Sequence, residues 1–111
     1  MQVTLEFQLT HDDFTDVVDT ACYCIDYWAD EVDYNAGVLS ISAEDGTEIH
    51  EITKADVEKA MASIMEGSVS VCDSIRADIT SAVRENDYGY VDGYAADAII
   101  QVACFGEIVY G

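Results

Sequence analysis

The chain has 111 residues, of which 50% are apolar, enough to build one hydrophobic core. Its formal net charge is −19, from 23 Asp and Glu against four Lys and Arg. Such a charge repels nucleic acids and anionic membranes, so direct nucleic-acid binding is the least expected activity, and cationic proteins or metal ions are the expected partners. We predict a single acidic globular domain over residues 1–111.

The cellular location follows from what the sequence lacks. No apolar stretch approaches the roughly 18 to 20 residues of a membrane span, and the first residues lack the basic and apolar parts of a signal peptide. We therefore expect a cytoplasmic protein without membrane contacts. The four cysteines do not have the dense spacing of a disulfide-rich secreted domain, so we expect them to be reduced and mostly buried.

The first two predicted elements are a strand and a long helix. Residues 2–10 alternate between polar and apolar side chains, the pattern of a strand with one buried face. Residues 12–33 repeat with a helical period, and Asn35 and Gly37 are expected to end that helix. The apolar side of the helix consists of Phe14, Val18, Ala21, Ile25, Trp28 and Val32.

The rest of the chain reads as a hairpin followed by three helices. Residues 38–43 and 47–52 flank Asp45-Gly46, a dipeptide that suits a tight hairpin turn. Thr53 with Asp56 resembles a capping box, Ser70 with Asp73 repeats that signal, and Asp92 can cap a last helix that Gly106 closes. Residues 107–110 form an extended tail that could add a strand. The predicted fold is α+β, an antiparallel sheet of three or four strands covered by helices, in the order β-α-β-β-α-α-α(-β).

The most informative feature is the acidity of the segment from residue 12 to residue 33. The first 53 residues hold thirteen Asp or Glu and no Lys or Arg. At about 100° per residue, six carboxylates and one tyrosine of this segment share one side of the predicted helix: Asp12, Asp16, Asp19, Tyr23, Asp26, Asp30 and Asp33. Like charges at i,i+4 destabilise a helix by a few tenths of a kcal/mol per pair, so a chain that keeps this stripe is expected to use its field.

The residues that could support catalysis or metal binding have little mutual organisation. His11 and His50 have no nucleophile at a recognisable spacing, and Cys22 and Cys24 would lie about 200° apart on a helix. The acidic loops of residues 44–48 and 85–92 lack the ligand order of a calcium-binding EF-hand. We expect a protein that is not an enzyme, with no cofactor and no metal.

The stripe alone is sparser than a phosphate backbone, because six carboxylates over about 31 Å give one charge per 5 to 6 Å, against about 3.4 Å for one DNA strand. A second acidic row on the hairpin would raise the density, and aromatic anchors inside a charged rim are typical of protein interfaces. We therefore predict a surface that imitates nucleic acid and binds the basic surface of a nucleic-acid-binding protein. Its further residues are Tyr27, Glu31, Glu44, Asp45 and Glu48, with Tyr34 and Glu51 nearby.

In size, charge and acidic character the chain resembles the small DNA-mimic proteins by which phages and mobile elements disarm host defence, such as anti-CRISPR and anti-restriction proteins. Two segments, Ile25-Asp26-Tyr27-Trp28 and Phe105-Gly106-Glu107-Ile108-Val109-Tyr110-Gly111, are similar to stretches of uncharacterised phage proteins. The resemblance implies a stoichiometric inhibitor of a CRISPR effector or a restriction enzyme, acting without turnover. It transfers no individual residue and leaves open whether the inhibitor acts as a homodimer.

Three other readings remain. An acidic phage-encoded adaptor would bind a host or phage protein through its aromatic residues, and would be more sensitive to changes at Tyr23 or Tyr27 than at aspartates. DNA mimicry predicts the reverse, with binding lost when Asp19, Asp26 and Asp30 are neutralised or reversed. Adaptation to high salt would also explain the acidity, although the four Cys and many Ile argue against it. Catalysis is the least expected of the four.

Overall fold

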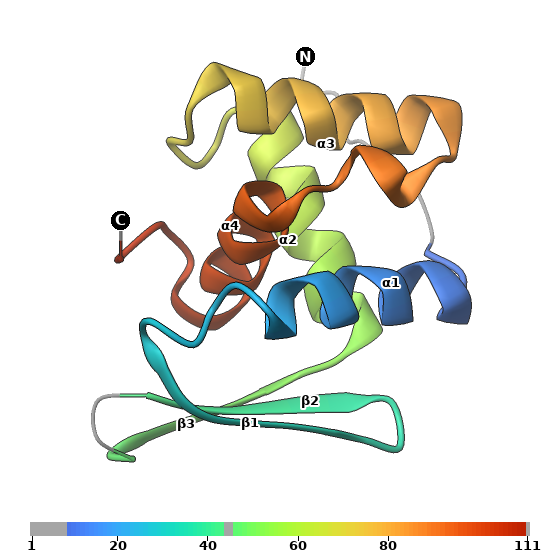
Figure 1. The fold of residues 1–111 in the computed structure, drawn as a ribbon. Coiled ribbons are helices and arrows are strands. Elements are labelled where there is room, and N and C mark those ends of the chain that lie inside the picture. The colour runs from blue at the N-terminus through green and yellow to red at the C-terminus, as the bar shows by residue number, and fades with distance from the viewer. Residues whose placement is uncertain (1–8, 44–45, 111) are drawn as a thin grey trace.

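The computed structural model describes residues 9–43 and 46–110. Within them, the chain forms a three-stranded antiparallel sheet with helices stacked on one of its faces (Figure 1). The elements in chain order are α1 (His11–Cys22), β1 (Ala29–Asn35), β2 (Val38–Ala43), β3 (Glu48–Ile52), α2 (Lys54–Glu66), α3 (Asp73–Glu85), the 3-10 turn η1 (Tyr88–Tyr90) and α4 (Gly93–Phe105). The predicted α+β class is confirmed.

The long acidic helix predicted over residues 12–33 is wrong. The helix ends at Cys22, the chain turns between Tyr23 and Trp28, and residues from Ala29 onward form the first strand of the sheet. Residues 25–34 are rich in aromatic and β-branched side chains, which favour strands over helices. Beyond Ala29, Val32 and Tyr34 alternate with outward acidic residues, and this period of two prevails because it lets the segment pair with β2.

The turn between β1 and β2 also shows why the predicted end of that helix, at Asn35 and Gly37, was wrong. Asn35 is the last residue of β1 and pairs with Val38, and the two-residue hairpin turn between them has φ of 54° at Ala36 and 80° at Gly37. Positive φ at both central residues is the geometry that matches the twist of two antiparallel strands. The signal that we assigned to a helix end therefore closes a β-hairpin.

The hairpin of β2 and β3 was predicted correctly, with Ile41 opposite His50 and Leu39 opposite Ile52. The first predicted strand falls mostly on residues 1–8 and so lies outside the described residues, while Leu9 and Thr10 are not in a strand. The backbone of Leu9 is held by α2 instead: its N–H donates to Glu58 Oε2 (2.7 Å) and its carbonyl accepts from Lys54 Nζ (3.0 Å). No strand is assigned within residues 107–110.

The later helices begin and end close to the predicted signals. Thr53 and Asp56 form a complete capping box, and Gly67 ends α2 in the left-handed conformation. Asp92 caps α4 through a bond from the backbone N–H of Ala95 (2.9 Å). The predicted cap of α3, Ser70 with Asp73, is not formed. The residue before the helix is Cys72, and its side chain makes no capping hydrogen bond.

The core lies between the helices and one face of the sheet, and α4 is its central element. This helix contacts α1, α2, α3 and β3, and its residues from Ala98 to Val102 are all buried. Phe14 of α1 contacts Tyr34 of β1 with ring centroids 5.8 Å apart, and His50 of β3 contacts Phe105 at 5.0 Å. The helices therefore cover the sheet face that carries Tyr34 and His50, and no element of the described residues covers the opposite face.

Candidate interface on the acidic sheet face

The open face of the sheet carries most of the charge that β1 and β3 contribute. Side chains alternate along each strand, so the residues facing away from the helices are fixed by the register. Asp33 pairs with Ser40, which pairs with Glu51; Glu31 pairs with Ser42, which pairs with Ile49. We call this surface the acidic sheet face: Asp30, Glu31, Asp33, Ser40, Ser42, Ile49 and Glu51.

The acidic sheet face has the form of two anionic edges around a small polar centre. Adjacent strands lie about 4.8 Å apart, which places Asp33 and Glu51 about 10 Å from one another across the serine row. A shallow depression of about 580 Å³ lies over β1 and β2 and is lined by Glu31, Asp33 and the two serines, among others. Ile49 is 72% exposed at its border and provides an apolar contact within the acidic rim.

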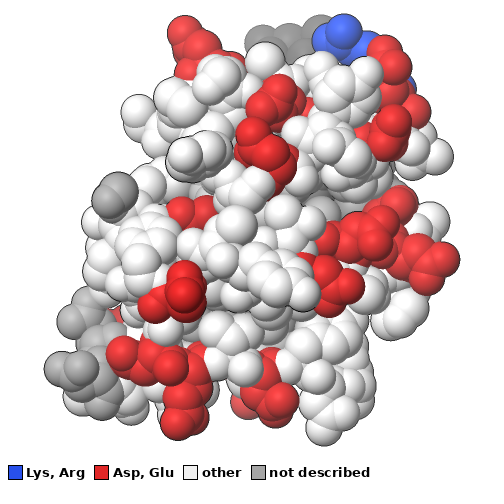
Figure 2. Space-filling view, in the orientation of Figure 1, with Lys and Arg blue, Asp and Glu red and all other residues white. Residues whose placement is uncertain are grey.

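These carboxylates have no basic partner among the described residues. Within residues 9–43 and 46–110, Arg76 forms an ion pair with Asp73, and His50 contacts Glu48 in a pair that is ionic only when the imidazole is protonated; both lie away from this face. In Figure 2, carboxylates are spread over the surface in view, while Lys and Arg atoms appear at the α3 end of the molecule, far from the sheet. The field of the sheet face is therefore not neutralised locally.

Asp30 has a structural role beside its charge. It lies at an irregularity in the β1–β2 pairing, and its carboxylate accepts a hydrogen bond from the backbone N–H of Gly46 (3.1 Å). This bond ties β1 to the turn between β2 and β3. Replacing Asp30 would therefore disturb the sheet as well as remove a charge.

The acidic residues of α1 lie on a different side of the molecule. Asp12, Asp16 and Asp19 are exposed and follow one helix face, opposite the buried Phe14. Because Phe14 packs against the inner side of the sheet, this α1 face points away from the sheet, and the acidic sheet face points away from α1. The two groups do not form one continuous surface.

The remaining predicted interface residues are dispersed. Tyr23 ends α1 and is 87% exposed, and Asp26 is exposed in the following turn. Glu48 lies on the helix side of the sheet, within 3.3 Å of His50 Nε2. Glu44 and Asp45 lie outside the described residues.

Tyr27 was predicted as an aromatic anchor of the interface; it is 54% exposed, and its hydroxyl group is hydrogen-bonded within the fold. It donates to Asp97 Oδ2 (2.5 Å) and accepts from Gln101 Nε2 (3.2 Å). Partial burial, followed by the hydrogen bond to Asp97, raises the pKa of Tyr27 to about 12. The ring is fixed in place, so Tyr27 is part of the packed structure as well as of the surface.

Asp97 and Gln101 were missed by the sequence reasoning. Asp97 accepts from Tyr27, from Trp28 Nε1 (2.9 Å) and from Gln101 Nε2 (3.0 Å). Gln101 is 1% exposed, and its Oε1 accepts the backbone N–H groups of Val109 and Tyr110, each at 2.9 Å. Two polar residues four apart in an otherwise apolar helix were the available signal, because buried polar groups are normally hydrogen-bonded.

The cysteines and acids offer no organised metal centre in the described part of the chain. None of its groups of three or more His, Cys, Asp or Glu side chains is arranged to hold a metal ion. All four cysteines are free; three are half-buried and Cys72 is exposed, so fewer thiols are buried than we predicted. A hydrogen bond with Ser74 lowers the pKa of Cys72, whereas burial raises that of Cys104 to about 12.

Comparison of the chain with protein-family models, curated proteins and solved structures gives no match. Among residues 9–43 and 46–110, no helix has both the length and the apolar character needed to cross a membrane.

Proposed function

We propose that this protein is a non-catalytic inhibitor that imitates nucleic acid and binds the basic nucleic-acid-binding surface of a bacterial defence complex, a CRISPR effector or a restriction enzyme, in the cytoplasm of the host cell. The observation that carries the proposal is the acidic sheet face, where Glu31, Asp33 and Glu51 are exposed without a basic partner in the described part of the chain. A surface with this charge attracts Lys and Arg side chains that otherwise contact phosphates.

The spacing of the acidic edges is compatible with such imitation. The two edges lie about 10 Å apart, between the widths of about 6 Å and 12 Å of the minor and major grooves of B-DNA. Along β1, Glu31 and Asp33 lie about 7 Å apart, since two residues of a strand rise by that length. This is sparser than a phosphate strand, so the proposal assigns the contact to a few Lys or Arg residues rather than to a long groove.

The first step of the test is a pull-down from bacterial lysate with the tagged protein, with and without excess duplex DNA and at rising salt. The proposal expects a nucleic-acid enzyme that both DNA and salt displace. A partner that neither displaces would contradict mimicry.

The second step compares two triple variants with the identified partner by calorimetry. One neutralises the acidic sheet face (Glu31→Gln, Asp33→Asn, Glu51→Gln), and the other removes the same charge from α1 (Asp12→Asn, Asp16→Asn, Asp19→Asn). We expect the sheet variant to weaken binding by at least about tenfold and to reduce its salt dependence, and the α1 variant to change it by less than about threefold. Equal losses in both would mean a nonspecific effect of total charge and would contradict the assigned surface.

A second candidate is the adaptor function, which one observation favours. Tyr23 is 87% exposed at the end of α1, and tyrosine is a common anchor of protein interfaces. An adaptor would lose binding on Tyr23→Ala and retain it in the sheet triple variant, which is the opposite of the outcome expected for mimicry.

A further inference from the structure

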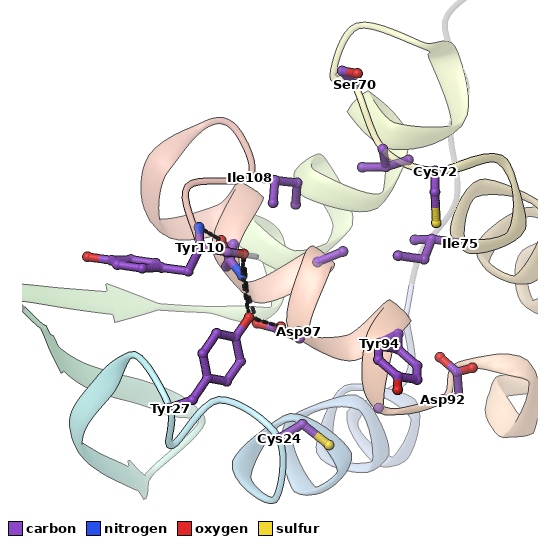
Figure 3. Close-up of a pocket in the computed structure, with 14 residues that line it drawn as sticks. Cys24, Tyr27, Ser70, Cys72, Ile75, Asp92, Tyr94, Asp97, Ile108 and Tyr110 are labelled. Carbon is purple, nitrogen blue, oxygen red and sulfur yellow. Dashed lines mark hydrogen bonds between the residues drawn. The ribbon is translucent and has the colours of Figure 1, made fainter.

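A large apolar groove lies between α3, α4 and the C-terminal tail, and neither proposed function uses it. Its volume is about 1130 Å³. Figure 3 shows Ile75 from α3 and Tyr94 from α4 on one side, with Ile108 and Tyr110 of the tail on the other. We call it the α3–α4 groove, with Val71, Ile75, Tyr94, Ala98, Ile108 and Tyr110 as its principal walls.

The walls of the groove are suited to apolar side chains. Half of the fourteen lining residues are aliphatic or aromatic, and Tyr94 leaves 80% of its surface exposed at the border. The volume exceeds the roughly 300 to 1,000 Å³ of typical small-molecule sites, and grooves that take several side chains of an amphipathic helix are a recurring form of peptide recognition. The shape therefore favours a segment of polypeptide over a single small ligand.

The charge of the groove restricts the segment further. Its ionisable acids are Asp92 and Asp97, and none of the lining residues is Lys or Arg. Asp92 accepts the helix-capping bond from Ala95, and Asp97 is held by three neutral donors, so neither carboxylate has a cationic partner among the described residues. A ligand that brings Lys or Arg would supply the missing countercharge, and the exposed ring of Tyr94 would add a cation–π contact.

The other occupants are disfavoured by the net charge of −19. A second copy of this chain would bring the same charge, and anionic lipid or nucleic acid would be repelled. We propose that the α3–α4 groove binds a short cationic amphipathic segment of another protein, with its apolar side chains against Ile75, Ala98 and Ile108 and its Lys or Arg side chains near Asp92 and Asp97. This inference does not depend on the acidic sheet face.

The fixed position of the walls supports binding. Gln101 holds the tail through Val109 and Tyr110, and Tyr110 stacks on Trp28 with ring centroids 5.5 Å apart. The tail side of the groove is therefore in place before a ligand arrives. Groups that are already ordered lower the entropic cost of association.

The test uses a fluorescein-labelled peptide of about 14 residues, long enough to form a helix on binding, with Leu at i, i+3, i+4 and i+7 and Lys elsewhere. A peptide of the same composition in scrambled order controls for nonspecific attraction to a strongly acidic protein. Binding to the full chain is followed by fluorescence anisotropy at about 0.15 M salt, which shortens long-range attraction to about 8 Å. We expect the amphipathic peptide to bind at least about tenfold more tightly than the scrambled one.

Matched variants locate the site. Tyr94→Ala is expected to weaken binding by about tenfold, whereas Tyr23→Ala, which truncates a similarly exposed tyrosine outside the groove, should change it by less than about twofold. Asp92→Asn should weaken binding by about threefold, because Asn keeps the helix cap but removes the charge. The sheet triple variant described above should leave peptide binding within about twofold of the original value.

Several outcomes would overturn the inference. Equal binding of the scrambled peptide, or equal losses for Tyr94→Ala and Tyr23→Ala, would show attraction to the overall charge. Loss of binding in the sheet triple variant alone would place the peptide on the acidic sheet face. Self-association that Tyr94→Ala abolishes would show that a second copy occupies the groove.

Discussion

Ala36 adopts a φ of 54° in the turn between β1 and β2, in a region that residues other than glycine seldom occupy. The cost of this conformation for a residue with a Cβ is roughly 1–2 kcal/mol, and Asn tolerates it better than Ala because its side chain can hydrogen-bond locally. The backbone of Ala36 in the β1–β2 hairpin, which carries Glu31 and Asp33, is therefore strained, and a substitution that suits positive φ should relieve this strain.

We expect Ala36→Asn to raise the free energy of unfolding by about 0.5–1 kcal/mol, and Ala36→Val to lower it by about 1 kcal/mol because β-branched residues fit this region poorly. Urea unfolding followed by the fluorescence of the single tryptophan, Trp28, measures both variants. A loss of stability in Ala36→Asn would contradict the turn geometry.

Tyr27 gives a prediction about pH. Because the folded state raises the pKa of Tyr27 from 10 to about 12, the fold favours the neutral hydroxyl. The corresponding contribution to stability is complete below pH 10 and is lost as the pH rises through the folded pKa of about 12. We expect stability to fall between these values less steeply in Tyr27→Phe than in the original chain.

The measurement is urea unfolding at a series of alkaline pH values, with Tyr23→Phe as the control for removal of an exposed hydroxyl. Tyr88, whose pKa burial also raises to about 12, leaves part of the slope in every variant. An unchanged slope in Tyr27→Phe would mean that its hydroxyl is not held by Asp97.

At the scale of elements, the boundary between α1 and β1 shows the limits of periodicity. The prediction that Ile25 and Trp28 are buried is confirmed although neither lies in a helix. Their burial follows from their hydrophobicity. The helix was inferred from the spacing of the apolar residues, and a turn followed by a strand produced a similar spacing by coincidence. Pairing with β2 decided between them, because a strand is stable only beside its partner.

Gln101 of α4 holds the C-terminal tail by hydrogen bonds, beside the stacking of Tyr110 on Trp28. Removing the amide of Gln101 would leave the backbone N–H groups of Val109 and Tyr110 without their acceptor and Asp97 without one donor. We expect Gln101→Leu to lower the free energy of unfolding by about 2–4 kcal/mol, in the range for lost buried hydrogen bonds. It should also alter the fluorescence of Trp28, which stacks on Tyr110.

Glu107→Gln, an exposed change in the same tail, is the control and should alter stability by less than about 0.5 kcal/mol. Urea unfolding and proteolysis of the tail provide the two measurements. A tail that stays protected in Gln101→Leu would show that ring packing alone holds it.

For the whole molecule, charge repulsion is the dominant unfavourable electrostatic effect. The net charge is −19, and the pairs Asp12/Asp16 and Asp16/Asp19 repel on the surface of α1. We expect the free energy of unfolding to rise by roughly 1 kcal/mol when NaCl is raised from about 0.02 M to 0.5 M, because salt screens several repulsions of a few tenths of a kcal/mol each.

The α1 triple variant is the matched test, since it removes three of these charges and should show a smaller salt effect. Thermal unfolding at several salt concentrations measures it. Unfolding of the original chain at low salt, with recovery only in concentrated salt, would instead support adaptation to a saline environment.

The α+β class, the β2–β3 hairpin, the caps of α2 and α4 and the overall acidity could be predicted from the sequence. These depend on local signals, such as Thr53 with Asp56, or on composition. The tertiary structure alone decided that the acids of residues 12–33 divide between α1 and β1 on opposite sides, and that Asp97 and Gln101 organise the tail. Both outcomes arise from contacts between separate elements, because strand pairing and buried polar networks gain their free energy only when partners meet in space.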